Sequence, residues 1–215
     1  MFLGYYNYTT KLTYISVGIG VLGMFFALDG HYPQAMAVLL LCGFIDMIDG
    51  KVAATKKNRT EKEKAYGVQI DSLADMVNFG ILPALIGYAL GLERWYFYII
   101  LVVYVIATLI RLAYFNVIEE ERVKSGDTSN RTYYNGLPVT MAGMIFPLLF
   151  CFYTLFDSST DLFAHFYAGL LVLTAFAFLF GKWKVPKARG IGLFVMSAIG
   201  LVQIIVIFYF FFSTR

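Results

Sequence analysis

Two short stretches decide the interpretation of this chain: DMIDGKVA at residues 46–53 and GVQIDSLAD at residues 67–75. They place four aspartates, Asp46, Asp49, Asp71 and Asp75, inside two otherwise apolar segments. A single carboxylate at bilayer depth costs about 2.5–3.5 kcal/mol on insertion scales. Four carboxylates without counter-charge would be very hard to tolerate, so we expect positive, multivalent ions to lie between them.

The composition is that of an integral membrane protein. Hydrophobic residues make up 60% of the chain and charged residues 14%, and the mean hydropathy is +0.70. Because a spanning helix needs about 20 mostly apolar residues, we predict an all-α, polytopic transmembrane helix bundle of about seven spans. The predicted spans are 11–28, 33–54, 66–90, 95–117, 137–156, 162–181 and 191–212. They leave no room for a separate soluble domain, so we treat residues 1–215 as one membrane domain.

The charges in the connecting loops predict the orientation. The 55–66 loop holds five basic residues against two acidic ones, and the 182–190 loop holds four basic residues and no acidic one. The alternate loops carry a single Lys or Arg residue, Arg94. The positive-inside rule therefore places the basic loops in the cytoplasm. We expect a multi-pass protein of the cell membrane with its N-terminus inside.

Helix geometry gathers the four aspartates. Asp46 and Asp49 lie about 60° apart around one helix, and Asp71 and Asp75 lie about 40° apart around the next. The helices are predicted to run antiparallel through a cytoplasmic loop, and counting residues from that loop gives the two pairs matching depths. All four carboxylates can therefore converge on one site near the cytoplasmic face.

The donor set indicates which cation is bound. Ligation by oxygen alone, without histidine or thiolate, favours Mg²⁺ or Mn²⁺. Four carboxylates exceed what one Mg²⁺ normally takes from protein, whereas two ions can share them and clamp phosphoryl oxygens. Gly50, Ala53 and Gly67 would leave room for a phosphate ligand. The alternative is that these small residues only pack helices together.

The pattern D-x-x-D-G-x-x-A…G-x-x-x-D-x-x-x-D resembles the motif of the CDP-alcohol phosphotransferases. The resemblance implies a core of six membrane helices, divalent metal, and transfer of a phosphatidyl group from CDP-diacylglycerol to an alcohol with release of CMP. It also implies that Asp46, Asp49 and Asp71 ligate metal and that Asp75 is both ligand and general base. Gly50, Ala53 and Gly67 would shape the nucleotide pocket. Dimerisation is common in that family, so a homodimer is expected.

Three further segments look like the bacterial phosphatidylserine synthase branch: IDSLADMVNFGILPA at 70–84, RLAYFNV at 111–117 and YNGLPVT at 134–140. This resemblance implies L-serine as the acceptor and no nucleic-acid partner. Serine carries a carboxylate, and Arg111 is the candidate to bind it because a guanidinium forks onto a carboxylate. The alternative is that Arg111 snorkels or pairs with an internal carboxylate. For Ser72 we expect a hydrogen bond within its own helix.

The chain departs from the family pattern in two places. Ala54 stands where the family usually has arginine, and the stretch from Ala53 to Gly67 is several residues longer than is common. A positive partner for the nucleotide must then come from elsewhere, and the sequence does not distinguish among the candidates. These are Lys51, Lys56, Lys57 and Arg59.

Two other functions stay open. The same chemistry could use glycerol phosphate, an inositol compound or choline as acceptor. A phosphorylated acceptor would call for a cluster of basic residues that the spans do not provide beyond Arg111. A cation transporter is the more remote alternative, since intramembrane carboxylates can form a transport site. Against it, the acids are predicted near one face rather than at the midplane, and no internal repeat is visible.

Overall fold

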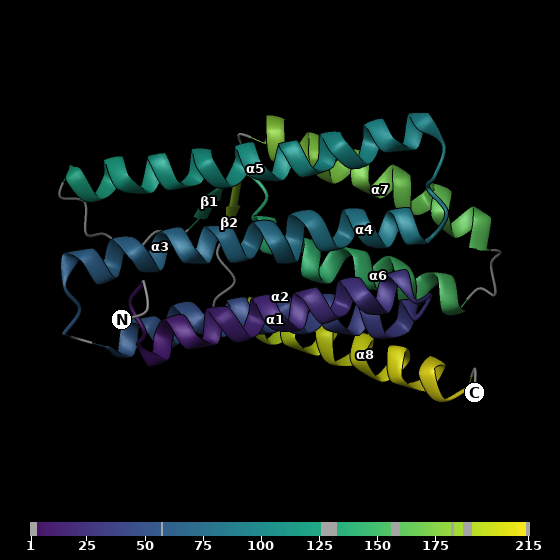
Figure 1. The fold of residues 1–215 in the computed structure, drawn as a ribbon, viewed down its shortest axis with the longest axis horizontal. Helices are drawn as coiled ribbons and strands as arrows, with labels where there is room; N and C mark the ends of the chain where they lie inside the picture. Colours follow the sequence, from purple (N-terminus) through teal and green to yellow (C-terminus); the bar gives the residue numbers. More distant parts are fainter. Residues whose placement is uncertain are drawn as a thin grey trace.

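A computed structural model describes residues 4–56, 58–125, 133–155, 160–181, 183–186 and 191–213. Apart from two short strands, the described elements are helices (Figure 1). The helices are α1 (Tyr8–Leu28), α2 (Tyr32–Thr55), α3 (Glu61–Asp75), η1 (Met76–Ile81), α4 (Leu82–Ala89), α5 (Trp95–Lys124), η2 (Val139–Met141), α6 (Ala142–Leu155), α7 (Thr160–Phe180) and α8 (Ile191–Ser213). The strands are β1 (Tyr133–Asn135) and β2 (Lys184–Pro186).

The predicted all-α membrane bundle is confirmed. Within the described residues, six helical stretches are long and apolar enough to cross a membrane, and α3, η1 and α4 form one of them as a continuous rod from Glu61 to Ala89. A seventh apolar helix, Val139–Thr154, is shorter. The chain is therefore a multi-pass membrane protein, and its short helix corresponds to the predicted span at 137–156.

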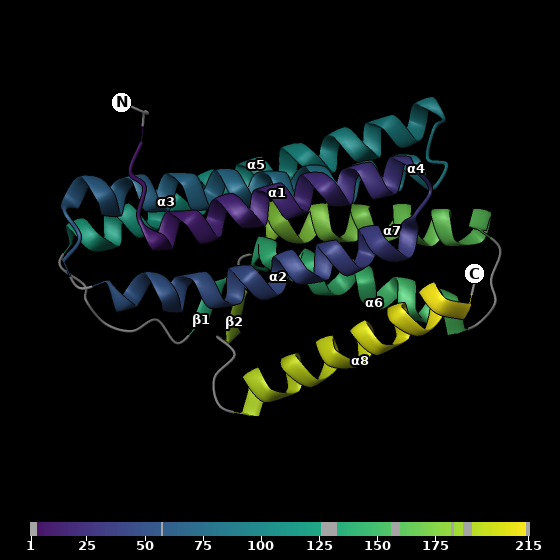
Figure 2. The same cartoon turned by 60° about the horizontal axis from the view of Figure 1, so that its bottom comes forward.

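The connections alternate between the two ends of the bundle. The start of α1, the α2–α3 connection and the end of α5 lie at one end, whereas the α1–α2 and α4–α5 connections lie at the other (Figure 1). β1 and β2 pair antiparallel, with Tyr134 opposite Val185, and so join the segments that follow α5 and α7. This arrangement agrees with the grouping of loops that the charge pattern predicts. Figure 2 shows α8 on the outside of the bundle, where it packs against α2 and α6.

Two helices extend further than the hydrophobic pattern predicts. α5 continues to Lys124 rather than ending near 117, and its last turns carry ion pairs of Glu119 with Arg122 (2.5 Å) and Glu120 with Lys124 (2.7 Å). Charged pairs at these spacings support a helix outside the apolar region. α3 begins at Glu61 rather than near 66 because Thr60 forms a capping box with Glu63.

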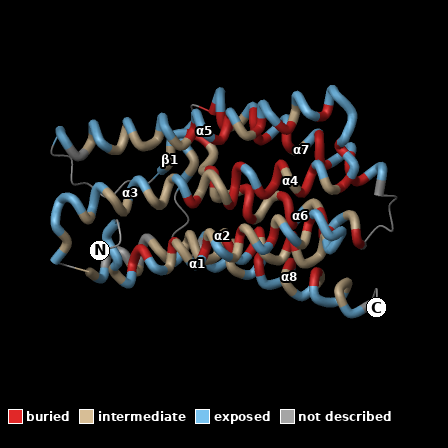
Figure 3. The backbone as a smooth tube through the Cα atoms, in the orientation of Figure 1, coloured by how far each residue is buried: buried red, intermediate tan, exposed pale blue. Residues whose placement is uncertain are grey.

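The buried aromatic core begins directly beyond the acidic cluster. Residues coloured as buried gather around α4, α6, α7 and the adjoining half of α5 (Figure 3). Within this core the π-helical segment η1 follows Asp75 directly. Pro83 has no N–H to donate to the carbonyl of Phe79 four residues earlier, and the buried Tyr104 hydroxyl donates to that carbonyl instead, at 2.7 Å. A tertiary contact therefore stabilises the helix irregularity next to the acidic cluster.

Candidate metal and nucleotide site

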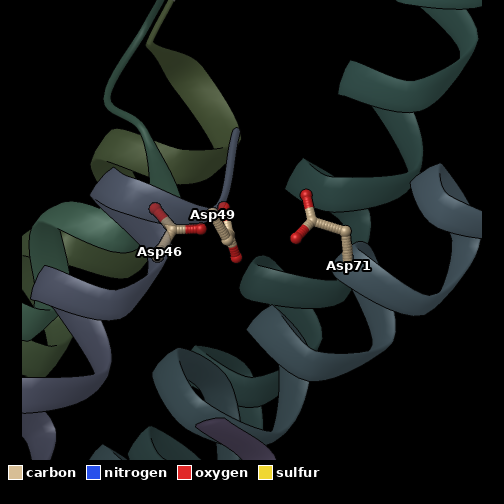
Figure 4. A group of neighbouring side chains, drawn as sticks. All are labelled: Asp46, Asp49 and Asp71. Atoms are coloured by element: carbon tan, nitrogen blue, oxygen red, sulfur yellow. The ribbon is translucent and has the colours of Figure 1, made fainter. Parts of the chain in front are cut away.

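Asp46, Asp49 and Asp71 converge as the helix geometry predicts. Asp46 and Asp49 project from α2 toward Asp71 on α3 (Figure 4). One carboxylate oxygen from each lies within 4.8 Å of the others, and all three residues are partly buried. Two carboxylates about 4 Å apart repel by about 4 kcal/mol at an effective dielectric constant near 20. This arrangement therefore calls for a bound cation or for protons.

Asp75 completes the group one turn further along α3. Its carboxyl is in hydrogen-bonding contact with Asp46 and interacts electrostatically with Asp46, Asp71 and Asp49. Asp49 and Asp71 are likewise in contact. The four acids thus form one cluster across the α2–α3 interface, and their role as metal ligands stays a prediction.

A second wall of the cluster comes from the segment between β1 and α6. The Asp46 carboxylate is also in hydrogen-bonding contact with Thr140 of η2. Burial and then the charge of Asp46 raise the pKa of Tyr134 on β1. Both residues belong to the YNGLPVT segment that the resemblance singled out. Hydropathy and helix geometry do not place them against Asp46, because that contact joins segments far apart in the chain.

A cavity of about 210 Å³ opens beside Asp49 and Asp71. α1 contributes three threonines that sequence reasoning missed, the segment between α2 and α3 contributes Arg59, and α3 contributes Lys64. The other lining residues are Thr9, Thr10, Thr13, Arg59, Lys64, Gly67, Val68 and Ile70. In the sequence, these threonines stand out as polar residues at the start of an apolar helix. Their position beside the acids depends on the packing of α1 against α3, which the sequence does not reveal.

The predicted nucleotide-pocket residues differ in what the structure says of them. Gly67 lines the cavity, and a Cβ there would lie 2.7 Å from Nη2 of Arg59. A larger residue at this position would displace the guanidinium. The surroundings of Gly50 and of the Ala53 side chain are outside the described part of the structure. The roles of Gly50 and Ala53 in the nucleotide pocket therefore stay predictions.

Arg111 is held by backbone carbonyls rather than by an internal carboxylate. The residue is 5% exposed; its Nε donates to the carbonyl of Leu137 at 3.2 Å, and its Nη2 donates to the carbonyl of Asn135. Between these carbonyls Gly136 adopts a positive φ of 81°. Among the described residues that line the cavity, Arg111 does not appear. Its predicted contact with serine stays a prediction.

The expectation for Ser72 was wrong. Its hydroxyl bonds to another helix, because Nδ2 of Asn116 on α5 donates to Ser72 Oγ at 2.8 Å. Ser72 lies between Asp71 and Asp75 in sequence, so this bond ties the acid-bearing turn of α3 to α5. Apolar periodicity alone does not reveal such a pairing across 44 residues.

A membrane helix bundle with four clustered carboxylates beside a small cavity lined by acidic and basic side chains defines a class of protein suited to binding cations together with an anionic ligand. Comparison with known proteins identifies the family. The profile of the CDP-alcohol phosphatidyltransferases matches residues 6–183. The chain belongs to the CDP-alcohol phosphatidyltransferase family.

Curated relatives carry serine-specific names. The CDP-diacylglycerol–serine O-phosphatidyltransferase of Saccharomyces cerevisiae is 35% identical over 130 residues, covering 59% of this chain and 46% of the relative. The protein of that name from Mycobacterium tuberculosis is 29% identical over 142 residues, covering 63% and 48%. An archaetidylserine synthase of Methanothermobacter thermautotrophicus is 24% identical over 182 residues, covering 84% and 70%. The chain spans about half the length of the first two relatives.

Replacing Arg111 tests its structural contacts. We expect Arg111→Ala to destabilise the protein by about 2–4 kcal/mol, because two buried carbonyls lose a charged donor. The thermal unfolding midpoint of the purified protein in detergent measures this effect. Arg94→Ala is the control, since Arg94 is exposed and its side chain donates only to the Tyr96 hydroxyl among the described contacts, at 3.2 Å. Equal midpoints for the two variants would contradict this account of Arg111.

Proposed function

We propose that this protein is a CDP-diacylglycerol–serine O-phosphatidyltransferase, which transfers the phosphatidyl group of CDP-diacylglycerol to the hydroxyl of L-serine and releases CMP. The observation that carries the proposal is the cluster of four carboxylates beside a cavity with basic lining residues. Such a site suits a diphosphate bound together with divalent cations. The names of the relatives support serine as acceptor rather than another alcohol.

We propose Mg²⁺ or Mn²⁺ as the cofactor, with two ions shared by Asp46, Asp49, Asp71 and Asp75. The donor set fits these metals, because carboxylate oxygens are the ligands that hard cations prefer, and three of the acids bring oxygens within 4.8 Å of one another. When bound, the ions supply positive charge that offsets the charge of the diphosphate.

The nucleotide half of the donor would occupy the cavity beside Asp49 and Asp71. Gly67 keeps this part of α3 free of a side chain. Among the α1 threonines, the hydroxyls of Thr9 and Thr10 already donate to Asn7 Oδ1 and to the Tyr5 carbonyl, which leaves Thr13 to offer a hydroxyl to polar groups. Gly50 and Ala53 follow Asp49 on α2 and would shape the same pocket. The acyl chains would stay in the lipid bilayer, against exposed apolar side chains such as Leu73 of α3.

Asp75 would act as the general base. It takes the proton from the serine hydroxyl as that oxygen forms a bond to the phosphorus bearing the diacylglycerol group. The bond between this phosphorus and the oxygen of CMP breaks, and CMP leaves with the electron pair. A carboxylate within the acid cluster is suited to this role because it lies beside the reacting phosphate. Arg111 would bind the serine carboxylate through guanidinium hydrogens not donated to the loop.

We further propose that the protein lies in the cell membrane with this site near the cytoplasmic face, and that it forms a homodimer. Support for the orientation comes from the loop charges and from the place of Asp46 and Asp49 in the last three turns of α2, just before the α2–α3 connection. The same end would give water-soluble serine access to the site. The homodimer rests on the family resemblance alone.

A panel of acceptors tests the proposed reaction. Purified protein is incubated with labelled CDP-diacylglycerol, Mn²⁺ and one alcohol at a time: L-serine, glycerol phosphate, inositol, inositol phosphate or choline. We expect a labelled phospholipid and CMP with L-serine alone. A product with another alcohol and none with serine would refute the acceptor. Failure with every alcohol, despite binding of the donor lipid, would instead count against the transferase activity.

The base is tested by Asp75→Asn, which keeps the shape of the side chain and removes its ability to take a proton. We expect turnover to fall by at least about a hundredfold, in line with the contribution of general bases, while the protein stays folded and still binds CDP-diacylglycerol. Asp29→Asn is the matched control, since Asp29 is exposed at the C-terminal end of α1, whereas the cavity lies at the N-terminal end of that helix. Substantial turnover in the Asp75 variant would refute this assignment.

A further inference from the structure

Arg59 folds back from the α2–α3 connection onto the face of α3 that carries Gly67. The guanidinium approaches so closely that a Cβ on Gly67 would lie 2.7 Å from Nη2 of Arg59. Arg59 also lines the cavity together with Asp49 and Asp71. A charged side chain from the connection therefore reaches the same space as two of the clustered acids.

The hydrogen bonding of Arg59 is incomplete. Its Nε is buried and has no hydrogen-bond partner within the described part of the chain. Leaving a buried donor unsatisfied is costly, and more so when the donor carries charge. Guanidinium groups in such positions are satisfied by anions that accept two parallel hydrogen bonds, such as phosphate or carboxylate.

The other described basic residues between the end of α2 and the first turns of α3 do not share that situation. Lys56 pairs with Glu63 at 2.7 Å. Lys64, at the cavity edge, pairs with Glu61 at 2.8 Å. Lys62 is exposed to solvent. Lys57 and the side chain of Lys51 lie outside the described residues. Arg59 is thus the described basic side chain that combines a cavity position with an unsatisfied buried donor.

The cavity lining carries charges of both signs. Asp49 and Asp71 provide oxygens suited to cations, and Arg59 provides N–H groups suited to an anion. A phosphate ester bound together with a divalent cation satisfies both at once. Serine is a weaker match for this place, because its carboxylate would have to share the cavity with the nucleotide.

We propose that Arg59 binds a phosphate group of the cytidine nucleotide, and that Gly67 is needed there because it leaves room for the guanidinium. This proposal rests on the proposed function, since it assumes a nucleotide in the cavity. It assigns the positive partner that Ala54 leaves unfilled. The α2–α3 connection, which is longer than in the common family pattern, would then supply a positive charge that other family members supply from the helix position of Ala54.

Paired ligands test the proposal. The equilibrium dissociation constants of CMP and of cytidine are measured for the purified full chain with Mn²⁺, and their ratio reports the contribution of the phosphate. We expect Arg59→Ala to weaken CMP binding about tenfold or more, as for loss of a charged hydrogen bond, and to leave cytidine binding unchanged. Arg59→Lys should bind CMP with an affinity between those of the wild type and Arg59→Ala, because lysine keeps the positive charge but cannot donate two parallel hydrogen bonds.

Lys62→Ala is the matched control. It removes one positive charge from an exposed position in the first turn of α3 and should change neither constant. Elution of each variant from a size-exclusion column as the same species as the wild type checks the fold. If Arg59→Ala fails that check, Arg59→Gln and Arg59→Lys provide the same comparison.

The possible failures are distinguishable. If the wild type prefers CMP to cytidine and Arg59→Ala keeps that preference in full, this proposal is wrong while the proposed function stands. If the wild type shows no preference for CMP over cytidine, the nucleotide site fails and the proposed function fails with it. If Arg59→Ala and Lys62→Ala weaken CMP binding equally, Arg59 contributes only its positive charge and not a direct contact with the phosphate. That result would also overturn the proposal.

Discussion

The four carboxylates at the α2–α3 interface repel one another, and this repulsion is the strongest electrostatic demand in the bundle. Carboxylates held within a few ångströms of one another in an apolar bundle cannot all stay charged without counter-ions. Asp46, Asp49 and Asp71 bring oxygens within 4.8 Å of one another, and Asp75 contacts Asp46. Such a cluster is costly for a fold, so it has to be explained by what it binds.

The surrounding architecture supports that cluster from several directions. Tyr104 stabilises the π-helical segment that follows Asp75, and Asn116 bonds Ser72 between Asp71 and Asp75. Arg111 holds the loop that leads to Thr140, which contacts Asp46. The buried residues gather in one half of the bundle (Figure 3). The cavity lies beside Asp49 and Asp71. The helices thus position polar groups that no single helix could place.

The sequence predicted the parts of this structure that depend on local pattern. Long apolar stretches predicted the helices, and the 3.6-residue period predicted that Asp46 and Asp49 would face Asp71 and Asp75. Charge in the loops predicted which connections share an end of the bundle. These features follow from hydropathy and helix geometry, which are properties of short segments.

The remaining features depend on contacts between distant segments. In the π-helical turn the Phe79 carbonyl accepts from the hydroxyl of Tyr104, 25 residues away, and the strand pair joins two loops that are far apart in sequence. Among four basic candidates, only the folded connection distinguishes Arg59, because its position over Gly67 is a tertiary contact. Periodicity likewise could not indicate that Arg111 would donate to the backbone of Asn135 and Leu137.

The most direct test of the central claim is to locate divalent ions in crystals of the protein grown with Mn²⁺ and CMP. Anomalous scattering collected near the manganese edge identifies the metal independently of the protein density. The account predicts anomalous peaks among the carboxylates of Asp46, Asp49, Asp71 and Asp75. Nucleotide density beside these four acids with no anomalous peak among them would contradict it.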